Sequence, residues 1–115
     1  MLSGYEHVPS ASEWRALGPE ALGVLVRLYN DTHERPYVRL RAVGAAGHFP
    51  SPAAHTFLLA VARAPRQSDL FVREALLALG RAFGRGAARE IRPFLGSPEP
   101  VVREAAATAL RRVGN

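Results

Sequence analysis

Four histidines are the side chains of this chain best suited to acid–base chemistry or metal binding. His48 and His55 flank one expected turn, which brings their imidazoles within reach of each other. A structural zinc ion needs about four protein ligands, however, and the chain has no cysteine to complete the set. No Ser-His-Asp pattern, phosphate loop or pair of carboxylates indicates another reaction. We therefore expect no metal, no cofactor and no catalysis by this chain alone.

The basic side chains offer a different chemistry, because all 15 are arginines and only 10 residues are acidic, for a net charge of +5. Guanidinium groups bind carboxylates and phosphates through paired hydrogen bonds. A GC-rich coding bias would also produce a lysine-free chain rich in Ala and Arg, and no basic run or nucleic-acid motif accompanies the charge. The charge favours an acidic partner without identifying it.

The length and hydropathy pattern restrict the class of protein. The chain has 115 residues, which is enough for one domain with a real core. Its longest apolar run, residues 57–62, is far shorter than the roughly 18 residues of a membrane span. Residues 1–7 lack the basic and apolar regions of a secretory signal. We expect a soluble, cytoplasmic protein.

The elements that position these side chains repeat along the chain. A Val-Arg pair recurs at Arg39, Arg73 and Arg103, which lie 34 and then 30 residues apart. Apolar residues follow each arginine at three, seven and ten positions, and this spacing forms one stripe on a helix. The residues of the three stripes are Ala42, Ala46, Phe49, Leu76, Gly80, Phe83, Ala106, Leu110 and Val113. We expect three amphipathic helices, with Phe83 as a core residue of the central one.

Each Val-Arg helix is the second helix of a pair, and the first helix is predicted upstream of it, over residues 19–29, 52–63 and 87–95. Ser51 is placed to cap the second of these, and Asp69 to cap the Val-Arg helix that follows it. Ile91, Phe94 and Leu95 form the apolar side of the third. Pro93 lies inside that helix and should shorten or kink it. The glycines at 84 and 86 are expected to end the helix before it.

These helical pairs resemble the HEAT repeat, and most closely the short HEAT-like repeat of the phycobilisome-lyase type. Residues 97–106 are very similar to that family's turn and second helix, and residues 87–95 resemble its first helix. The resemblance implies an all-α fold, namely a short right-handed α-solenoid of three helical pairs in a single domain. The expected units are an N-terminal capping helix within residues 1–17, around Trp14, and repeats over 18–50, 51–85 and 86–115.

The family resemblance also implies structural roles, because an acidic residue in the turn and the Val-Arg arginine tie adjacent repeats together. The residues at the matching positions are Asp69, Glu99, Arg39, Arg73 and Arg103. Arg35 replaces the acid in the first turn, so the partner of Arg39 is expected to be Asp31 or Glu34. The His33-Glu34 pair is similar to those of the HEAT-repeat hydroxylase that acts on deoxyhypusine. A single pair cannot build the di-iron site of that family.

The outward face of the Val-Arg helices is the expected binding surface, as in HEAT arrays. Its middle would be an open floor of small residues, among them Gly44, Gly47 and Ala78. Glu74 and Glu104 would lie at one end and arginines at the other. The partner-binding residues expected on and around this face are Leu40, Arg41, Arg81, Arg85, Thr108, Arg111 and Arg112.

Three functions are consistent with this pattern. The leading interpretation is a non-catalytic scaffold or adaptor that binds an acidic or amphipathic protein segment on the second-helix face. A second is nucleic-acid binding, since HEAT-like folds of some DNA glycosylases cradle duplex DNA. A third is an accessory subunit of a lyase-type enzyme complex. The uncovered C-terminal repeat also suggests a homodimer contact, and no membrane partner is expected.

Overall fold

The structure is a computed structural model that describes residues 20–114, and this part of the chain is all helical. Its elements are α2 (Glu20–Asn30), α3 (Pro36–Ala46), α4 (Pro52–Arg63), α5 (Asp69–Phe83), α6 (Arg85–Ile91), the 3-10 helix η1 (Arg92–Gly96) and α7 (Pro100–Gly114). The all-α prediction is confirmed for these residues. The capping helix predicted around Trp14 lies outside them. No helix within residues 20–114 is long and apolar enough to cross a membrane.

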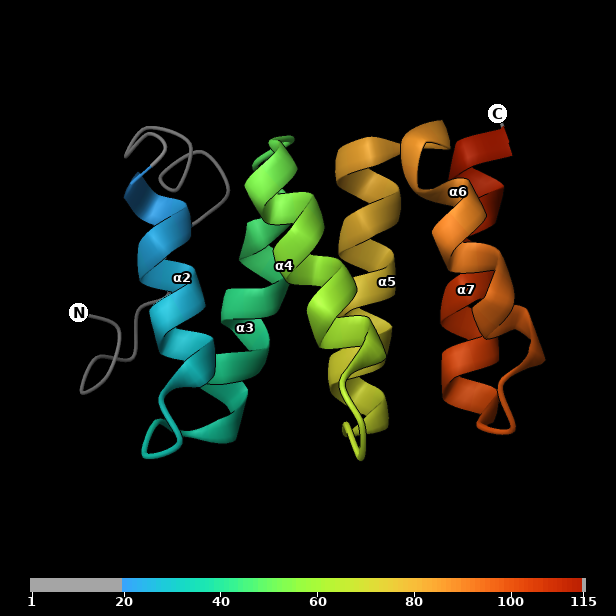
Figure 1. Cartoon of the computed structure of the whole chain (residues 1–115). Coiled ribbons are helices and arrows are strands. Elements are labelled where there is room, and N and C mark those ends of the chain that lie inside the picture. Colours follow the sequence, from blue (N-terminus) through green and yellow to red (C-terminus); the bar gives the residue numbers. More distant parts are fainter. Residues whose placement is uncertain (1–19, 115) are drawn as a thin grey trace.

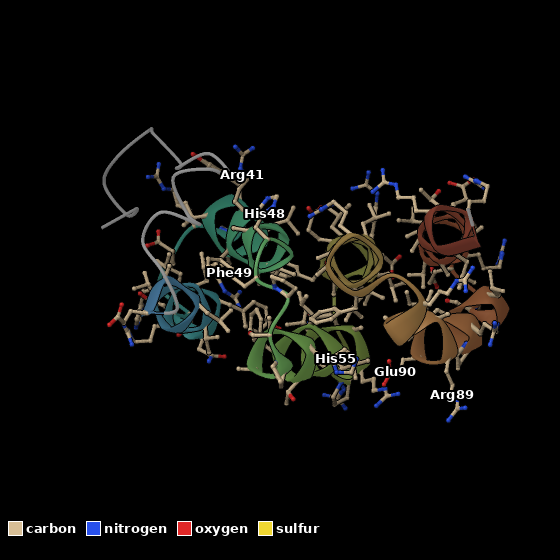
Figure 2. The ribbon with its side chains drawn as sticks, turned by 90° about the horizontal axis from the view of Figure 1, so that it is seen from above. Arg41, His48, Phe49, His55, Arg89 and Glu90 are labelled. Carbon is tan, nitrogen blue, oxygen red and sulfur yellow. The ribbon has the colours of Figure 1, made fainter. Side chains whose placement is uncertain are left out.

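The helices form two layers, which Figure 2 shows end-on. One layer, the first-helix layer, contains α2, α4 and α6, and the other, the second-helix layer, contains α3, α5 and α7. The chain alternates between the layers, and successive helices run in opposite directions (Figure 1). Each helix of the second layer therefore ends at the same side of the molecule. Contacts join α2 to α3, α4 to α5 and α6 to α7, and they also join α5 to both α3 and α7.

Hydrogen bonds at the helix ends explain where two of the helices begin. The Ser51 hydroxyl accepts a hydrogen bond from the Ala54 amide at 3.2 Å, which confirms it as the cap of α4. The predicted cap of α5 is wrong, because Ser68 takes that position and accepts from the Leu70 amide at 3.3 Å. Asp69 is already helical, and there its carboxylate lies beside the positive end of the helix.

The segment between α5 and α7 departs most from the predicted boundaries. A single residue, Gly84, joins α5 to α6 with a φ of +52°, a conformation that favours glycine. The helix starts at Arg85 rather than at residue 87, so Gly86 lies inside it and does not terminate the preceding helix. Pro93 shortens it as predicted: α6 has 7 residues and continues as the 3-10 helix η1. Leu95 is 44% exposed and not part of an apolar stripe.

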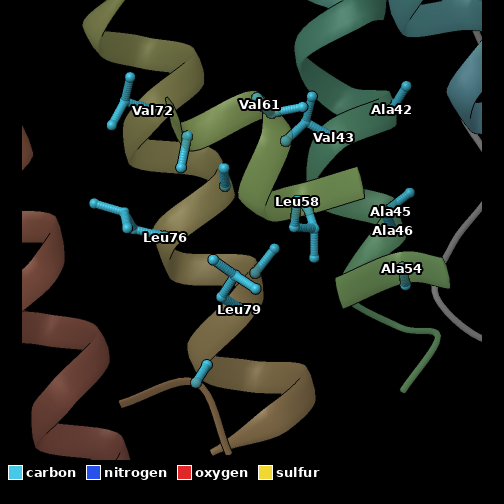
Figure 3. Close-up of a cluster of buried hydrophobic side chains, with 14 of the residues drawn as sticks. Ala42, Val43, Ala45, Ala46, Ala54, Leu58, Val61, Val72, Leu76 and Leu79 are labelled. Carbon is cyan, nitrogen blue, oxygen red and sulfur yellow. The ribbon is translucent and has the colours of Figure 1, made fainter. Parts of the chain in front are cut away.

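The core lies between the two layers and consists of aliphatic side chains (Figure 3). Leu58 of α4 and Leu76 and Leu79 of α5 are completely buried. Phe49 is buried as well, whereas Phe83, expected as a core residue of the central repeat, is only partly buried and packs against the core. Phe83 is the last residue of α5, and its ring packs edge-on against the ring of His55, with centroids 5.0 Å apart.

Candidate binding surface

Small residues in the second-helix layer are used for helix packing and do not form an open floor. Gly44, Gly47 and Ala78 are all buried. A Cβ atom added at Gly47 would lie 2.9 Å from the Ala78 Cβ, so α3 and α5 approach too closely for a larger residue. Gly80 of α5 meets Ala109 of α7 in the same way. The predicted floor is therefore wrong, because the neighbouring helix covers it.

The described residues form a hollow of about 700 Å³ on this layer, where the three helices end. We call it the basic hollow. Its lining residues are Gly47, His48, Pro50, Gly80, Arg81, Ala82, Gly84 and Arg112. Two arginines from different helices thus face one space, and no carboxylate of the described residues lines it.

Arg81 is the best-defined side chain of the basic hollow. One of its terminal nitrogens donates a hydrogen bond to the Gly44 carbonyl oxygen of α3 at 3.1 Å. Burial lowers the pKa of the Arg81 guanidinium, the Glu74 carboxylate opposes this shift, and the positive charge of Arg112 adds to it. The lowering by Arg112 indicates that the two like charges repel each other, and a bound anion would relieve that repulsion.

The second hollow, of about 340 Å³, lies between α5 and α7, and we call it the α5–α7 slot. Its lining residues are Arg73, Leu77, Val101, Glu104, Ala105, Thr108 and Arg112. Three of these are aliphatic, and Val101 is 39% exposed although it is a large apolar residue. Arg112 lines both hollows, so the slot and the basic hollow are adjacent.

The structure brings some of the predicted partner-binding residues together and separates others. Arg81, Arg112 and Thr108 line the two hollows. Arg111 donates a hydrogen bond to the Thr108 hydroxyl at 3.0 Å. Leu40, Arg41 and Arg85 line neither hollow: Leu40 is partly buried, Arg41 is exposed on α3 (Figure 2), and Arg85 is the exposed first residue of α6.

Seven residues of the hollows were not predicted to lie on this surface, namely Pro50, Arg73, Leu77, Gly80, Gly84, Val101 and Ala105. Pro50 and Gly84 lie in the connections that follow α3 and α5, and their position in the repeat could have indicated them. Leu77 and Val101 carry no such signal, because an apolar residue on an amphipathic helix is ordinarily assigned to the core.

Two of the three Val-Arg arginines, Arg39 and Arg103, bind backbone carbonyl groups where the family resemblance implied turn acids. The Arg39 Nε donates to the Tyr29 carbonyl oxygen at 2.7 Å, and Arg103 donates to the Ser97 carbonyl oxygen at 2.8 Å. Within residues 20–114, neither Asp31 nor Glu34 forms an ion pair with Arg39. Both accept backbone amides of their own turn instead, from His33 and Arg35 respectively.

The middle pair is joined differently. Arg73 lies 3.7 Å from Glu74, its neighbour in sequence, and makes no bridge to the turn. Gln67 takes over the role expected of Arg73. The Gln67 side-chain amide donates to the Val61 carbonyl oxygen at 3.0 Å and to the Tyr29 hydroxyl at 2.7 Å. Glu99 contributes through its backbone, because its carbonyl oxygen accepts the Val102 and Arg103 amides at the start of α7.

The three histidines of the described residues, His33, His48 and His55, do not assemble into one metal site. His55 is hydrogen-bonded to Glu90 of α6, with Nε2 3.1 Å from Oε1. Figure 2 shows His48 in the second-helix layer, away from His55 in α4. No group of three or more His, Asp or Glu side chains that could hold a metal ion occurs in the part of the chain that the structure describes.

Comparison with known proteins adds no family to this description: no family model, curated protein or solved structure matches the chain. The residues and their geometry therefore define the class, an all-helical protein with two adjacent hollows on one layer.

Proposed function

We propose that this chain is a non-catalytic adaptor that binds an acidic segment of another protein on its second-helix layer. The observation that carries the proposal is the convergence of Arg81 and Arg112 on a hollow of about 700 Å³ without a carboxylate among the described residues that line it. Paired guanidinium groups suit a carboxylate, which accepts two hydrogen bonds from each. His48 is the one acid–base side chain in that lining, and no nucleophile accompanies it.

The same proposal includes the architecture. We propose that the six helices are three HEAT-like pairs, α2–α3, α4–α5 and α6–α7, stacked as a short right-handed solenoid. The alternation of the helices between two layers supports this, and so do the close contacts of α5 with α3 and α7. A solenoid buries its apolar stripe only by stacking, and its second helices then form one continuous surface for a partner.

A protein partner suits this surface better than a nucleic acid. Glu74 and Glu104 lie among the arginines of the second-helix layer, and a phosphate backbone would meet both signs of charge. Among the described residues, no phenylalanine, tyrosine or tryptophan lines either hollow, and His48 is the one ring there on which a base could stack. The basic hollow accommodates a few side chains and does not form a basic track along the whole layer.

The first experiment is site-specific photocrosslinking in a lysate of the source cell treated with nuclease. A photoreactive residue replaces Ala82, which lines the basic hollow, or, as the matched control, Ala60 on α4 of the opposite layer. We expect one protein to crosslink at position 82 and not at position 60. A crosslinked product that disappears with nuclease would instead identify the partner as a nucleic acid and contradict the proposal.

Charge reversal then tests the site. Arg112→Glu should weaken binding of the crosslinked partner and reduce its dependence on salt, because an attraction between opposite charges is screened by ions. Arg63→Glu is the matched control, since Arg63 is an exposed arginine in the last turn of α4, outside both hollows. Equal affinities of the two variants would remove the basic hollow from the proposal.

A further inference from the structure

We infer that the basic hollow and the α5–α7 slot form one recognition track for a peptide that carries an apolar side chain and a carboxylate on the same side. This inference rests on the proposed function and names the partner's chemistry. Arg112 lines both hollows, which makes the track continuous. The carboxylate occupies the end with Arg81, and the apolar side chain occupies the slot.

The apolar end of the track is built from Leu77, Val101 and Ala105. Val101 is the informative residue, because a large aliphatic side chain in the first turn of a helix, 39% exposed and beside a hollow, gains from being covered. A slot of about 340 Å³ holds one aliphatic side chain of a partner. Burial of that side chain would supply an affinity that charge alone does not.

Charge favours one direction of the peptide. Arg73 and Arg112 line the slot, but Glu104 lines it as well and Arg73 lies 3.7 Å from Glu74, so carboxylates offset the positive charge there. No carboxylate of the described residues lines the basic hollow, which therefore attracts an acidic side chain more strongly. The guanidinium groups of Arg81 and Arg112 would lose solvent without compensation if an apolar side chain covered them.

The spacing follows from helix geometry. Leu77 precedes Arg81 by one turn on α5, whereas Val101 precedes Arg112 by three turns on α7. Four residues of helix rise about 6 Å, and eleven rise about 16 Å. An extended peptide covers these distances with about two to five residues. The apolar residue and the acid should therefore be separated by two to five positions in an extended peptide, or by four to eleven in a helical one.

Two substitutions test the two ends separately. Val101→Asp places a charge in the slot, and Arg112→Glu reverses the charge that both hollows share. Val101 is the second residue of α7, where a carboxylate favours the helix, so the fold should be retained. Leu70→Asp is the matched control, because Leu70 is the second residue of α5, 54% exposed and outside both hollows. Arg63→Glu is the control for Arg112→Glu.

The probe is a library of random 12-residue peptides displayed on phage, selected on the wild-type chain and counter-selected on Arg112→Glu. We expect enriched peptides to place an acid two to five positions from an apolar residue if they bind in an extended form, and four to eleven positions from it if they bind as a helix. In fluorescence polarisation, replacing either peptide residue by alanine should weaken binding about tenfold. The Val101→Asp variant should no longer discriminate the apolar residue, and the Arg112→Glu variant should no longer discriminate the acid. The two control variants should bind like the wild type.

The outcomes separate this inference from the proposed function. Acidic peptides that lack the apolar position and bind the Val101→Asp variant normally would overturn the track and leave the basic hollow as the binding site. A selection in which no peptide binds the wild-type chain more tightly than Arg112→Glu would overturn both.

Discussion

Arg39 contacts the carbonyl oxygen and the ring of Tyr29, near the end of α2, and the ring of Phe71 on α5. Its Nε donates to the Tyr29 carbonyl oxygen at 2.7 Å, and its guanidinium carbon lies 5.1 Å and 5.4 Å from the ring centroids of Tyr29 and Phe71. The side chain thus joins α2, α3 and α5. A planar cation both stacks on rings and donates in its own plane, which a lysine ammonium cannot do.

We therefore expect Arg39→Lys to lower the free energy of unfolding by about 1–3 kcal/mol, the range for a hydrogen bond from a charged group. Chemical denaturation measures this change. Arg41→Lys is the control, since Arg41 is exposed on the same helix and lines neither hollow; it should change stability by less than about 0.5 kcal/mol. Equal effects of the two substitutions would contradict the structural role of Arg39.

Leu76 is more deeply buried than Phe83, so we expect Leu76 to contribute more to the stability of the fold. Leu76 is fully buried between the layers, so Leu76→Ala should cost about 2–5 kcal/mol. Phe83 is partly buried at the end of α5, and Phe83→Ala should cost less despite the larger side chain removed. Thermal denaturation of both variants compares them directly. A lower midpoint for Phe83→Ala than for Leu76→Ala would show that the aromatic residue, and not the leucine, holds the layers together.

At the scale of elements, glycine determines how closely the second helices pack. Gly47→Ala should be destabilising, because its new Cβ would lie 2.9 Å from the Cβ and 3.0 Å from the Cα of Ala78, and backbone cannot move away cheaply. Gly23→Ala in α2 should have the opposite sign and stabilise by about 0.5–1 kcal/mol, since among the described residues only the flexible end of Arg27 lies within 4 Å.

Denaturation midpoints of the two glycine variants give this test, and each is the control for the other. A stabilised Gly47→Ala variant would mean that α3 and α5 are further apart than the structure has them. A destabilised Gly23→Ala variant would mean that α2 is covered on that side.

The His55–Glu90 pair links α4 to α6 across the first-helix layer (Figure 2). Both side chains are roughly one-quarter exposed, at 26% and 27%, so solvent screens the interaction. A double-mutant cycle of His55→Ala and Glu90→Ala should give a coupling energy of about 0.2–1 kcal/mol. Arg89→Ala in place of Glu90→Ala should be additive with His55→Ala, because no contact joins Arg89 to His55. An additive His55–Glu90 pair would show that the contact contributes nothing.

At the scale of the whole molecule, α5 is the central element. It contacts α3, α4, α6 and α7, and six of its residues are buried. Hydrogen exchange should therefore be slowest for the amides of α5 and faster for those of α2 and η1, which lie at the periphery of the described part. Exchange in α5 as fast as in α2 would contradict one cooperative core centred on α5.

The helices could be predicted from the sequence because helical periodicity and capping depend on residues that are near in sequence. The Val-Arg spacing and apolar stripes located α3, α5 and α7, and Ser51 and Pro52 located the start of α4. These signals act between residues near in sequence, through helical period and capping, and a sequence contains them completely. The same rules failed where two local signals compete, as with Ser68 and Asp69 for one cap.

The residue types of the candidate site could be predicted from the sequence, but their arrangement could not. The sequence by itself determined that the chain is helical, that arginines lie on the second helices and that small residues accompany them. Only the tertiary structure decided what these residues do, because that depends on distances between helices. Gly47 and Gly80 let the helices pack so closely that the expected floor is buried, whereas Val101 stays exposed and Arg112 meets Arg81 only when α7 packs against α5. Periodicity states which side of a helix is apolar, but only packing determines which part of that side remains uncovered.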